Sequence, residues 1–386
     1  MLLFFISLCG IASSIAYRAI DPLVTEISRE FSIAVATAAL ATSAYALPFA
    51  LSQPVLGPIG DTFGKGRLLA ICLAILTLTL IALPFATSFD MLIALRFIGG
   101  LAAGGTMPVA LALVGDKFPP AQRQLAIARF VAAALLGQIC ASSLAGLFAE
   151  ILNWRVIFFA GAVVSGLAAL GAAFKLAEAR KPDAPRINLA QAYQNYPVIF
   201  RNPKSYLCYG GVFLEAIAVF GILPYIAEIL ESHQLGGPKE AGVIIAGLGV
   251  GGILYSFVLA WLMRYLGRTG LLALGGGLGA LGLFASIIIP VWPIFFVLIT
   301  LLGFGFGMLH NTLQTEVSSL APQARSAAFS VHAFSFFLGQ ALGPVIFGFG
   351  LHHLGLIPTI VGHSLLLASV GLGTAYLFKR QSGELR

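Results

Sequence analysis

The sequence repeats itself at about half its length. When it is shifted by 202 positions, Pro22 falls on Pro224 and Gln138 falls on Gln340. In a strongly apolar chain, such a repeat is typical of two homologous membrane bundles in one polypeptide, with a substrate site between them. The repeat therefore predicts a two-bundle architecture and favours transport. The same shift superposes Glu26 on Glu228, Ile27 on Ile229, Arg123 on Arg325, Gly137 on Gly339 and Gly146 on Gly348.

The composition places this architecture in a membrane. Of the 386 residues, 59% are hydrophobic and 10% are charged, and the mean hydropathy is +0.96. A water-soluble domain of this size cannot cover its surface with so few charges. Because a helix needs ~20 apolar residues to cross the ~30 Å hydrocarbon core, twelve spans are predicted. They are residues 2–24, 34–58, 67–87, 90–114, 123–147, 153–177, 205–229, 240–264, 269–290, 292–317, 325–350 and 355–378.

Six of these spans fall in each half of the chain. Residues 1–177 are predicted to form an N-terminal six-helix bundle, residues 205–386 a C-terminal one, and residues 178–204 a cytoplasmic linker. The predicted fold is therefore all-α and integral to the membrane. Its two pseudo-symmetric bundles are expected to enclose a central cavity.

The net charge of +7 does not indicate nucleic-acid binding, because the basic residues lie mostly on one side of the predicted topology. Seventeen of the 22 lysines and arginines fall on that side, which predicts that both termini and the linker face the cytoplasm. The four cysteines stand singly in apolar runs, without metal-ligand spacing. We therefore expect neither a metal nor a cofactor.

The loop between the second and third spans combines glycines, an acid and basic residues. It contains Gly57, Asp61, Gly64, Lys65 and Arg67. Glycines permit tight turns and close helix approach, and an acid in this loop suits a helix N-terminus or a basic partner. The loop resembles the signature loop of the major facilitator superfamily, although the basic residue that usually follows the acid is a threonine in this chain.

Two further segments carry the same resemblance. The second half keeps a weaker copy of the loop, with Arg264, Gly267 and Arg268, and span 4 begins with Arg96 followed by paired glycines. The resemblance covers the whole chain, is nearest to the bacterial twelve-span drug and sugar efflux branch, and implies a monomer in a bacterial cytoplasmic (inner) membrane. The predicted cytoplasmic gate comprises Gly57, Asp61, Gly64, Lys65, Arg67, Asp116, Arg123, Arg264, Gly267, Arg268, Glu316 and Arg325.

Charged residues inside the spans are the first candidates for function, because burying a charge in a bilayer costs ~2.5–3.5 kcal/mol on insertion scales. Arg18 and Asp21 are three residues apart on one face of span 1 and are expected to pair. Arg96 lies at a similar depth in span 4. We predict a buried network of these three residues in which Asp21 exchanges protons. The alternative is a static pair that locks spans 1 and 4 together.

Glu215 is the sharpest single candidate. It lies near the middle of span 7, without a basic residue within a helical turn or two. An unpaired carboxyl group in this place is suited to carry a proton or to contact substrate. Alternatively, it forms a hydrogen bond with a neighbouring helix and has no further role.

Polar residues in other spans complete a predicted cavity. His310 and Gln314 share one face of span 10, with Asn311 beside it. Such a stripe suits a cavity wall that binds a polar substrate, although interhelical hydrogen bonds would explain it equally well. The predicted cavity residues are Tyr45, Gln53, Gln138, Glu215, Tyr255, His310, Asn311, Gln314 and Gln340.

These features predict a secondary transporter rather than an enzyme, because the sequence holds no nucleotide-binding or catalytic motif. The first hypothesis is proton-coupled efflux, by antiport, of a small organic compound through alternating access. The second is proton-coupled uptake of a polar or anionic metabolite. Span 5 lacks the Gly-Pro pair typical of proton-driven exporters, and buried arginines suit an anion. A third, from another class, is a membrane sensor or lipid-handling protein on the same scaffold.

Overall fold

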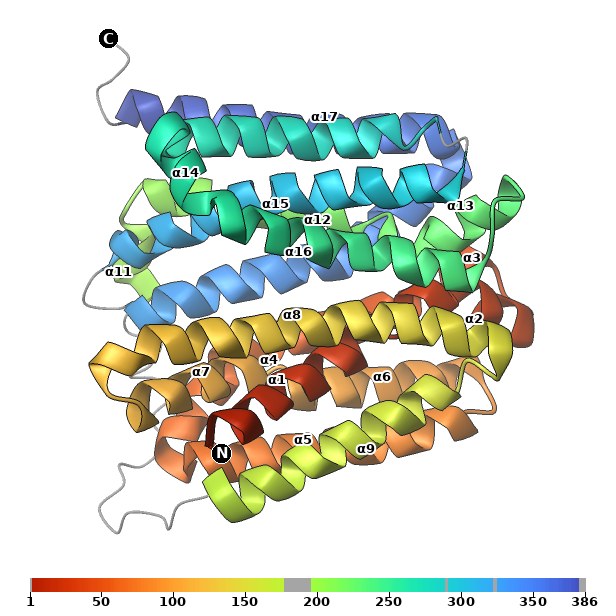
Figure 1. Ribbon diagram of the computed structural model, residues 1–386, viewed down its shortest axis with the longest axis horizontal. Helices are drawn as coiled ribbons and strands as arrows, with labels where there is room; N and C mark the ends of the chain where they lie inside the picture. The colour runs from red at the N-terminus through yellow and green to blue at the C-terminus, as the bar shows by residue number, and fades with distance from the viewer. Residues whose placement is uncertain (1, 177–195, 289–290, 322–324, 382–386) are drawn as a thin grey trace.

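The computed structural model describes residues 2–176, 196–288, 291–321 and 325–381, without the side chains at positions 57, 58, 61, 62, 120, 121, 124, 196, 318, 325 and 326. Its described elements are helices that run along the long axis of one bundle (Figure 1). The N-terminal half comprises α1 (Leu2–Arg18), η1 (Asp21–Leu23), α2 (Val24–Glu30), α3 (Val35–Ala38), α4 (Leu40–Phe63), α5 (Lys65–Ala82), η2 (Leu83–Phe85), α6 (Phe89–Ala103), α7 (Thr106–Lys117), α8 (Pro120–Ile151), α9 (Val156–Gly171) and the π-helical turn η3 (Ala172–Leu176). The C-terminal half comprises α11 (Tyr196–Phe200), α12 (Lys204–Phe220), η4 (Leu223–Tyr225), α13 (Ile226–Ser232), α14 (Pro238–Ala285), α15 (Trp292–Leu320), α16 (Arg325–Leu354) and α17 (Leu356–Gln381).

The described residues contain eleven helices long and apolar enough to cross a membrane. One of them, α14, has 48 residues, and Gly267 breaks it with φ 61° and ψ −174°. The two segments on either side of this break correspond to the separately predicted spans 240–264 and 269–290. The prediction of twelve membrane-spanning helices in an all-α fold is therefore confirmed.

The repeat is visible in the backbone where one helix of each half breaks near its middle. Helix α1 ends at Arg18, before the short turn η1, and α12 ends at Phe220, before η4. Each turn carries a proline in its first positions, and proline cannot donate the backbone hydrogen bond that would continue the helix. Turns η1 and η4 contact each other, so the two breaks meet where the halves meet.

The bundle has two distinct ends (Figure 1). Both chain ends lie at one of them, here called the terminus end, and α2, α3 and α13 lie at the other, here called the far end. The halves meet mainly through α8 with α14 and α4 with α16. At the far end α8 and α14 touch backbone to backbone, since a Cβ atom added to Gly146 would lie 2.1 Å from the carbonyl oxygen of Pro238.

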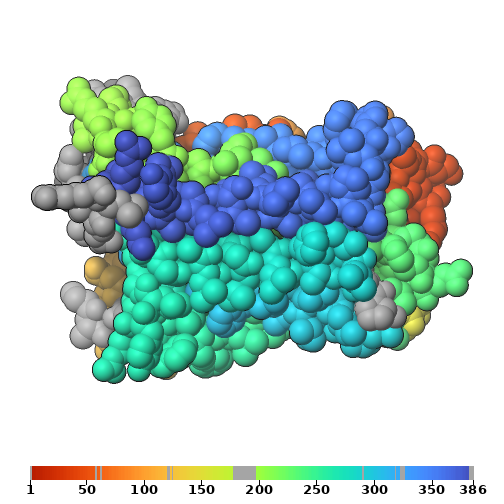
Figure 2. Space-filling model, turned by 90° about the horizontal axis from the view of Figure 1, so that it is seen from above, coloured from red at the N-terminus to blue at the C-terminus, as the bar shows by residue number. Residues whose placement is uncertain are grey.

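Glycines also set the packing inside the C-terminal half, where α14 lies against α15 and α17. Figure 2 shows these helices side by side on one face of the molecule. A Cβ atom on Gly251 would lie 2.1 Å from the carbonyl oxygen of Thr300, and one on Gly276 would lie 2.6 Å from the Cα of Gly371. Small residues at membrane helix interfaces permit this close approach.

Candidate transport site

The break in α1 positions the first polar cluster. Arg18 is the last residue of α1 and Asp21 the first of η1, and they form an ion pair in which Nη1 lies 3.2 Å from Oδ2. The hydroxyl of Thr42 on α4 donates to the other oxygen of Asp21, at 2.9 Å. Asp21 is fully buried. Both of its oxygens are therefore satisfied within the N-terminal half.

Arg18 also reaches the C-terminal half. Its Nη2 donates to the side-chain oxygen of Gln340 on α16, and its guanidinium carbon lies 4.5 Å from the ring centre of Phe220 on α12. The same carbon lies 4.7 Å from the ring centre of Tyr17. Arg18 is therefore held between the two bundles by one acid, one amide and two aromatic rings.

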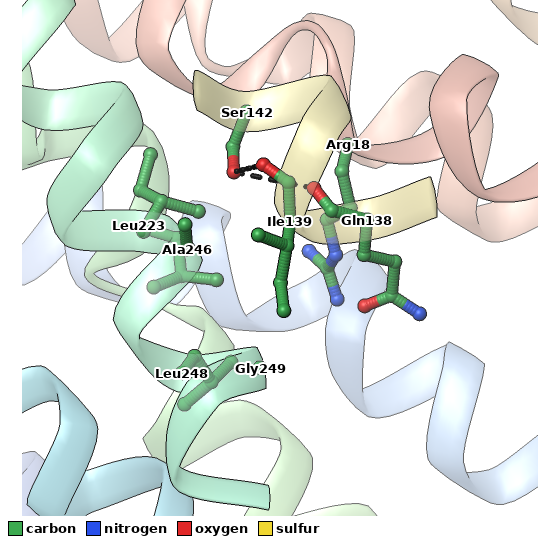
Figure 3. Close-up of a pocket in the computed structure, with 9 residues that line it drawn as sticks. Arg18, Gln138, Ile139, Ser142, Leu223, Ala246, Leu248 and Gly249 are labelled. Carbon is green, nitrogen blue, oxygen red and sulfur yellow. Dashed lines mark hydrogen bonds between the residues drawn. The ribbon is translucent and has the colours of Figure 1, made fainter. Parts of the chain in front are cut away.

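A small pocket opens beside this arginine, where the two halves meet (Figure 3). Its volume of about 20 Å³ has room for about one water molecule. Figure 3 shows the guanidinium of Arg18 directed into this space next to Gln138 and Ile139. Accommodating a substrate therefore requires the halves to move apart. The pocket is lined by Arg18, Gln138, Ile139, Ser142, Leu223, Ile245, Ala246, Leu248 and Gly249.

Arg96 on α6 was predicted to join a network with Arg18 and Asp21, but its described hydrogen bonds go elsewhere. Its Nε donates to the carbonyl of Ala41 at 3.0 Å and its Nη1 to that of Ala16 at 2.6 Å, and its guanidinium stacks on the ring of Tyr45 at 4.2 Å. The hydrogen bonds described for Arg96 thus go to backbone carbonyls, one of them that of Ala16 in the last turn of α1, where carbonyls lack intrahelical partners, and another that of Ala41 at the start of α4. Arg96 supports the shape of span 1, and its described hydrogen bonds do not include Asp21.

The second polar cluster lies in the C-terminal half. The carboxyl group of Glu215 on α12 is fully buried, and its Oε1 lies 2.5 Å from Nδ1 of His310 on α15. Its Oε2 has no hydrogen-bond partner among the described residues. The sequence analysis treated Glu215 and His310 separately, whereas the structure joins them.

A second histidine, which the sequence analysis did not select, adjoins this pair. His332 on α16 is 2% exposed, and neither of its ring nitrogens has a described hydrogen-bond partner. Its ring centre lies 5.1 Å from that of His310. Its position near His310 depends on how α15 and α16 pack, so no local sequence pattern marks it.

Aromatic rings connect the two clusters. Phe220, which stacks on Arg18, lies 5.4 Å from Phe306 and 5.6 Å from Phe336. Phe336 in turn lies 4.5 Å from the ring of His310. This aromatic wall, defined as Phe220, Phe306 and Phe336, joins the ion pair of one half to the acid–histidine pair of the other. The sequence analysis missed all three residues, because phenylalanine is common throughout the spans.

The other predicted cavity residues are dispersed. Tyr255 is buried in a separate hydrophobic cluster with Leu262, Leu271 and Met308. Gln53 is buried and its amide nitrogen has no described partner. Asn311 is exposed, and Gln314 is half-buried. Of the predicted set, the structure brings Gln138 and Gln340 to the Arg18 pocket, His310 to Glu215, and Tyr45 beneath Arg96.

The predicted gate residues lie at the terminus end. Lys65 pairs with Asp116 at 2.6 Å within the N-terminal half, and Arg268 pairs with Glu316 at 2.8 Å within the C-terminal half. Gly64, with φ 102°, forms the turn before α5, a conformation that favours glycine. Arg67, Arg123 and Arg264 are exposed. Gly57, and the side chains of Asp61 and Arg325, lie outside the described part.

At the far end, two of the described ion pairs cross between the halves, whereas Arg29–Glu26 and Arg155–Glu30 lie within the N-terminal half. Arg29 pairs with Glu231 at 2.5 Å, and Lys239 pairs with Glu150 at 3.2 Å. Arg29 and Glu231 are also 202 positions apart, so each occupies the place of the other in the repeat. The far end is therefore closed in this structure by direct contact across the pseudo-two-fold axis.

Comparison with known proteins agrees with this architecture. A model of the Major Facilitator Superfamily matches residues 6–344 and 205–384. The chain is 24% identical over 346 residues to the uncharacterized MFS-type transporter YybF of Bacillus subtilis (strain 168), covering 88% of this chain and 85% of that protein. It is also 24% identical over 328 residues to the quinolone resistance protein NorA of Staphylococcus aureus (strain MRSA252), covering 82% and 83%.

Solved transporters share the fold at low sequence identity. A mutant of the nucleoside transporter NupG superposes with a TM-score of 0.78 at 13% identity, over 98% of this chain and 99% of that chain. A bacterial homologue of the human lysosomal transporter Spinster, in an inward-facing and unoccupied conformation, gives 0.75 at 16% identity, over 98% and 97%. The family match covers nearly the whole sequence, so this chain belongs to the major facilitator superfamily and is a multi-pass membrane transporter.

Proposed function

We propose that this protein exports a small organic compound in exchange for protons. The observation that carries the proposal is Glu215, whose buried carboxyl group has His310 as its described partner and one oxygen without any. A buried carboxylate needs either a proton or a cationic group beside it. A proton and a substrate that both bind Glu215 exclude each other, and this exclusion is the basis of antiport.

Alternating access converts this exclusion into transport. Protonation of Glu215 favours one orientation of the halves and substrate binding the other, because coupling requires different binding free energies in the two orientations. The basic residues orient the terminus end toward the cytoplasm. The far-end contacts then form the outer gate, and Lys65–Asp116 and Arg268–Glu316 belong to the inner one. The similarity to NorA supports export as the direction.

The proposal also includes the oligomeric state, the membrane, the orientation and the domain bounds of the protein. It acts as a monomer in a bacterial cytoplasmic membrane, with both termini inside. Its bundles are residues 1–177 and 205–386, and residues 178–204 form the cytoplasmic linker. The proton is the coupling ion because the buried titratable groups at the boundary, Asp21 and Glu215, are acids.

Proton release on ligand addition tests the proposal. Purified protein in unbuffered detergent is mixed with lipophilic cations, neutral compounds and organic anions, and pH is followed for the wild type, Glu215→Gln and Asp21→Asn. We expect release in the wild type and its loss in Glu215→Gln. Glu228→Gln is the matched control, since Glu228 is another poorly exposed acid of the same half with one unpartnered oxygen. Binding without proton release contradicts antiport.

One observation favours a second candidate, proton-coupled uptake of an anion. Arg18 lines the pocket between the halves and is neutralised by Asp21. Protonation of Asp21 would free Arg18 to bind an anion, so proton and anion would bind together rather than in competition. In the same experiment, proton uptake on addition of organic anions, lost in Asp21→Asn, identifies this mechanism.

A further inference from the structure

We propose that the exported compound is amphoteric. Its acid group binds Arg18, its basic group binds Glu215, and a flat apolar body lies between them along the aromatic wall. This inference rests on the proposed export by proton antiport, and it names the class of compound that the site takes. Three independent features of the boundary between the halves carry it.

The first feature is the donor capacity of Arg18. A guanidinium group carries five N–H donors, and the described hydrogen bonds of Arg18 go to Asp21 and Gln340. The side chain is almost fully buried and borders the pocket. A carboxylate carries the opposite charge and can accept two parallel hydrogen bonds from a guanidinium group, whereas the amide of Gln340 is neutral, so a substrate carboxylate displaces Gln340 from Arg18. This exchange also removes a contact between the halves.

The second feature is the unpartnered oxygen of Glu215. Oε1 is occupied by His310, whereas Oε2 is buried without a described partner. A substrate ammonium group supplies the missing donors and the opposite charge. Leaving a buried acceptor unsatisfied is unfavourable, so this contact supplies the hydrogen bond that Oε2 lacks.

The third feature is the spacing between these groups. Phe220 contacts Arg18 and follows Glu215 by five residues on α12, so their backbone positions are about 7.5 Å apart along the helix axis. We infer from this axial offset that one aromatic ring with a substituent at each end can reach from Arg18 to Glu215. The aromatic wall fills the same interval and leads to His310, and aromatic side chains suit a flat ring.

The arrangement separates recognition from coupling. Arg18 retains its charge through the cycle and selects for the acid group, whereas Glu215 holds either a proton or the basic group. A compound without an acid loses the contact with Arg18 but still competes with the proton. A compound without a basic group binds Arg18 alone and releases no proton. Only the amphoteric compound uses both contacts.

Three probes with one common ring test this inference: 4-(aminomethyl)benzoate, its methyl ester and 4-methylbenzoate. Their affinities for the purified full-length protein are measured by titration calorimetry. For the wild type, we expect the amphoteric probe to bind at least about tenfold more tightly than either of the others. Arg18→Gln is expected to abolish its advantage over the ester, and Glu215→Gln its advantage over 4-methylbenzoate. Arg29→Gln, which removes an arginine at the far end, is the control and keeps both ratios.

The outcomes separate the two proposals. If the ester binds the wild type as tightly as the amphoteric probe, or if Arg18→Gln keeps the ratio, the Arg18 assignment is wrong. If no probe binds, the inference is also wrong. If the affinity ratios hold but binding releases no proton, the assignment of Arg18 stands and export by antiport fails. Arg18→Lys retains the charge without the planar fork and is expected to retain part of the preference, which covers the case in which Arg18→Gln does not fold.

Discussion

The two polar clusters lie on related scaffolds but have opposite chemistry. In the N-terminal half, Arg18 and Asp21 neutralise each other at a helix break, and all oxygens of the acid are satisfied. In the C-terminal half, Glu215 lies within the helix α12, has His310 as its described partner and keeps one oxygen unsatisfied. The first cluster presents donors to the boundary between the halves, and the second presents an acceptor.

The repeat shows where this difference arose. Under the shift of 202 positions Arg18 falls on Phe220 and Asp21 falls on Leu223, so neither charge has a counterpart. The prolines of the two helix breaks, Pro22 and Pro224, coincide instead. Backbone features are therefore shared between the halves, whereas the buried charges belong to one half each.

The largest expected effect separates Arg96 from Arg18. Replacing Arg96 by alanine leaves the carbonyls of Ala16 and Ala41 without their donor and removes the stacking on Tyr45. We expect the free energy of unfolding in detergent to fall by about 3 kcal/mol or more. The double variant Arg18→Ala/Asp21→Ala, which leaves no buried acid without its partner, is expected to cost less than half of that. Equal losses in chemical denaturation would remove the distinction between a structural and a substrate-binding arginine.

A smaller effect distinguishes the two histidines beside Glu215. His310→Phe takes away the described partner of a buried carboxyl group, and should lower the free energy of unfolding by about 2 kcal/mol. His332→Phe removes two nitrogens without described partners and keeps an aromatic ring, so its effect should stay within about 1 kcal/mol. Thermal unfolding of both variants in one detergent measures the two losses of stability. A larger loss for His332→Phe would mean that His332 is the true anchor of the cluster.

The contact between the halves offers a further test through Gly146. A Cβ atom at this position would lie 2.1 Å from the carbonyl oxygen of Pro238, so Gly146→Ala is expected to push the far end open at a cost of about 1–2 kcal/mol. Gly210 is the matched control, because a Cβ atom there meets nothing within 4 Å. Distances between spin labels on α2 and α13 would report the change. An unchanged distribution in Gly146→Ala would show that this contact does not hold the far end closed.

Much of the fold could be predicted because hydropathy depends on consecutive residues and the repeat on a fixed shift of the sequence. The twelve spans and the boundary between the eighth and ninth spans near Gly267 follow from such patterns, whereas the helix breaks at Pro22 and Pro224 lie inside spans that were predicted as continuous. The pair of Glu215 and His310 could not be foreseen, because its members are 95 residues apart on different helices. Their meeting depends on how α12 and α15 pack.

The predicted network of Arg18, Asp21 and Arg96 shows which contacts of a buried charge can be predicted from sequence spacing and which cannot. Arg18 and Asp21 could be paired from their spacing of three residues on one helix, and the structure brings them together. Arg96 was placed at the right depth, but the hydrogen bonds described for it go to carbonyls near the break in span 1 and at the start of α4. Backbone carbonyls do not appear in a sequence pattern, so a side chain that caps a helix break looks like one that pairs with an acid.

The smallest expected effect concerns Arg29 and Glu231, which occupy equivalent positions of the repeat and pair across the axis at 2.5 Å. Both side chains are partly exposed, so the pair should contribute only about 0.2–1 kcal/mol to closing the far end. Arg29→Glu and Glu231→Arg should each shift the spin-label distances toward the open form. The double exchange, which restores opposite charges, should reverse most of that shift, and added salt should weaken all three effects. If the double exchange behaves as the sum of the single ones, the pair does not act as a latch. The far end would then be held by the other contacts between the halves, such as Lys239–Glu150 and the close helix packing at Gly146 and Gly242.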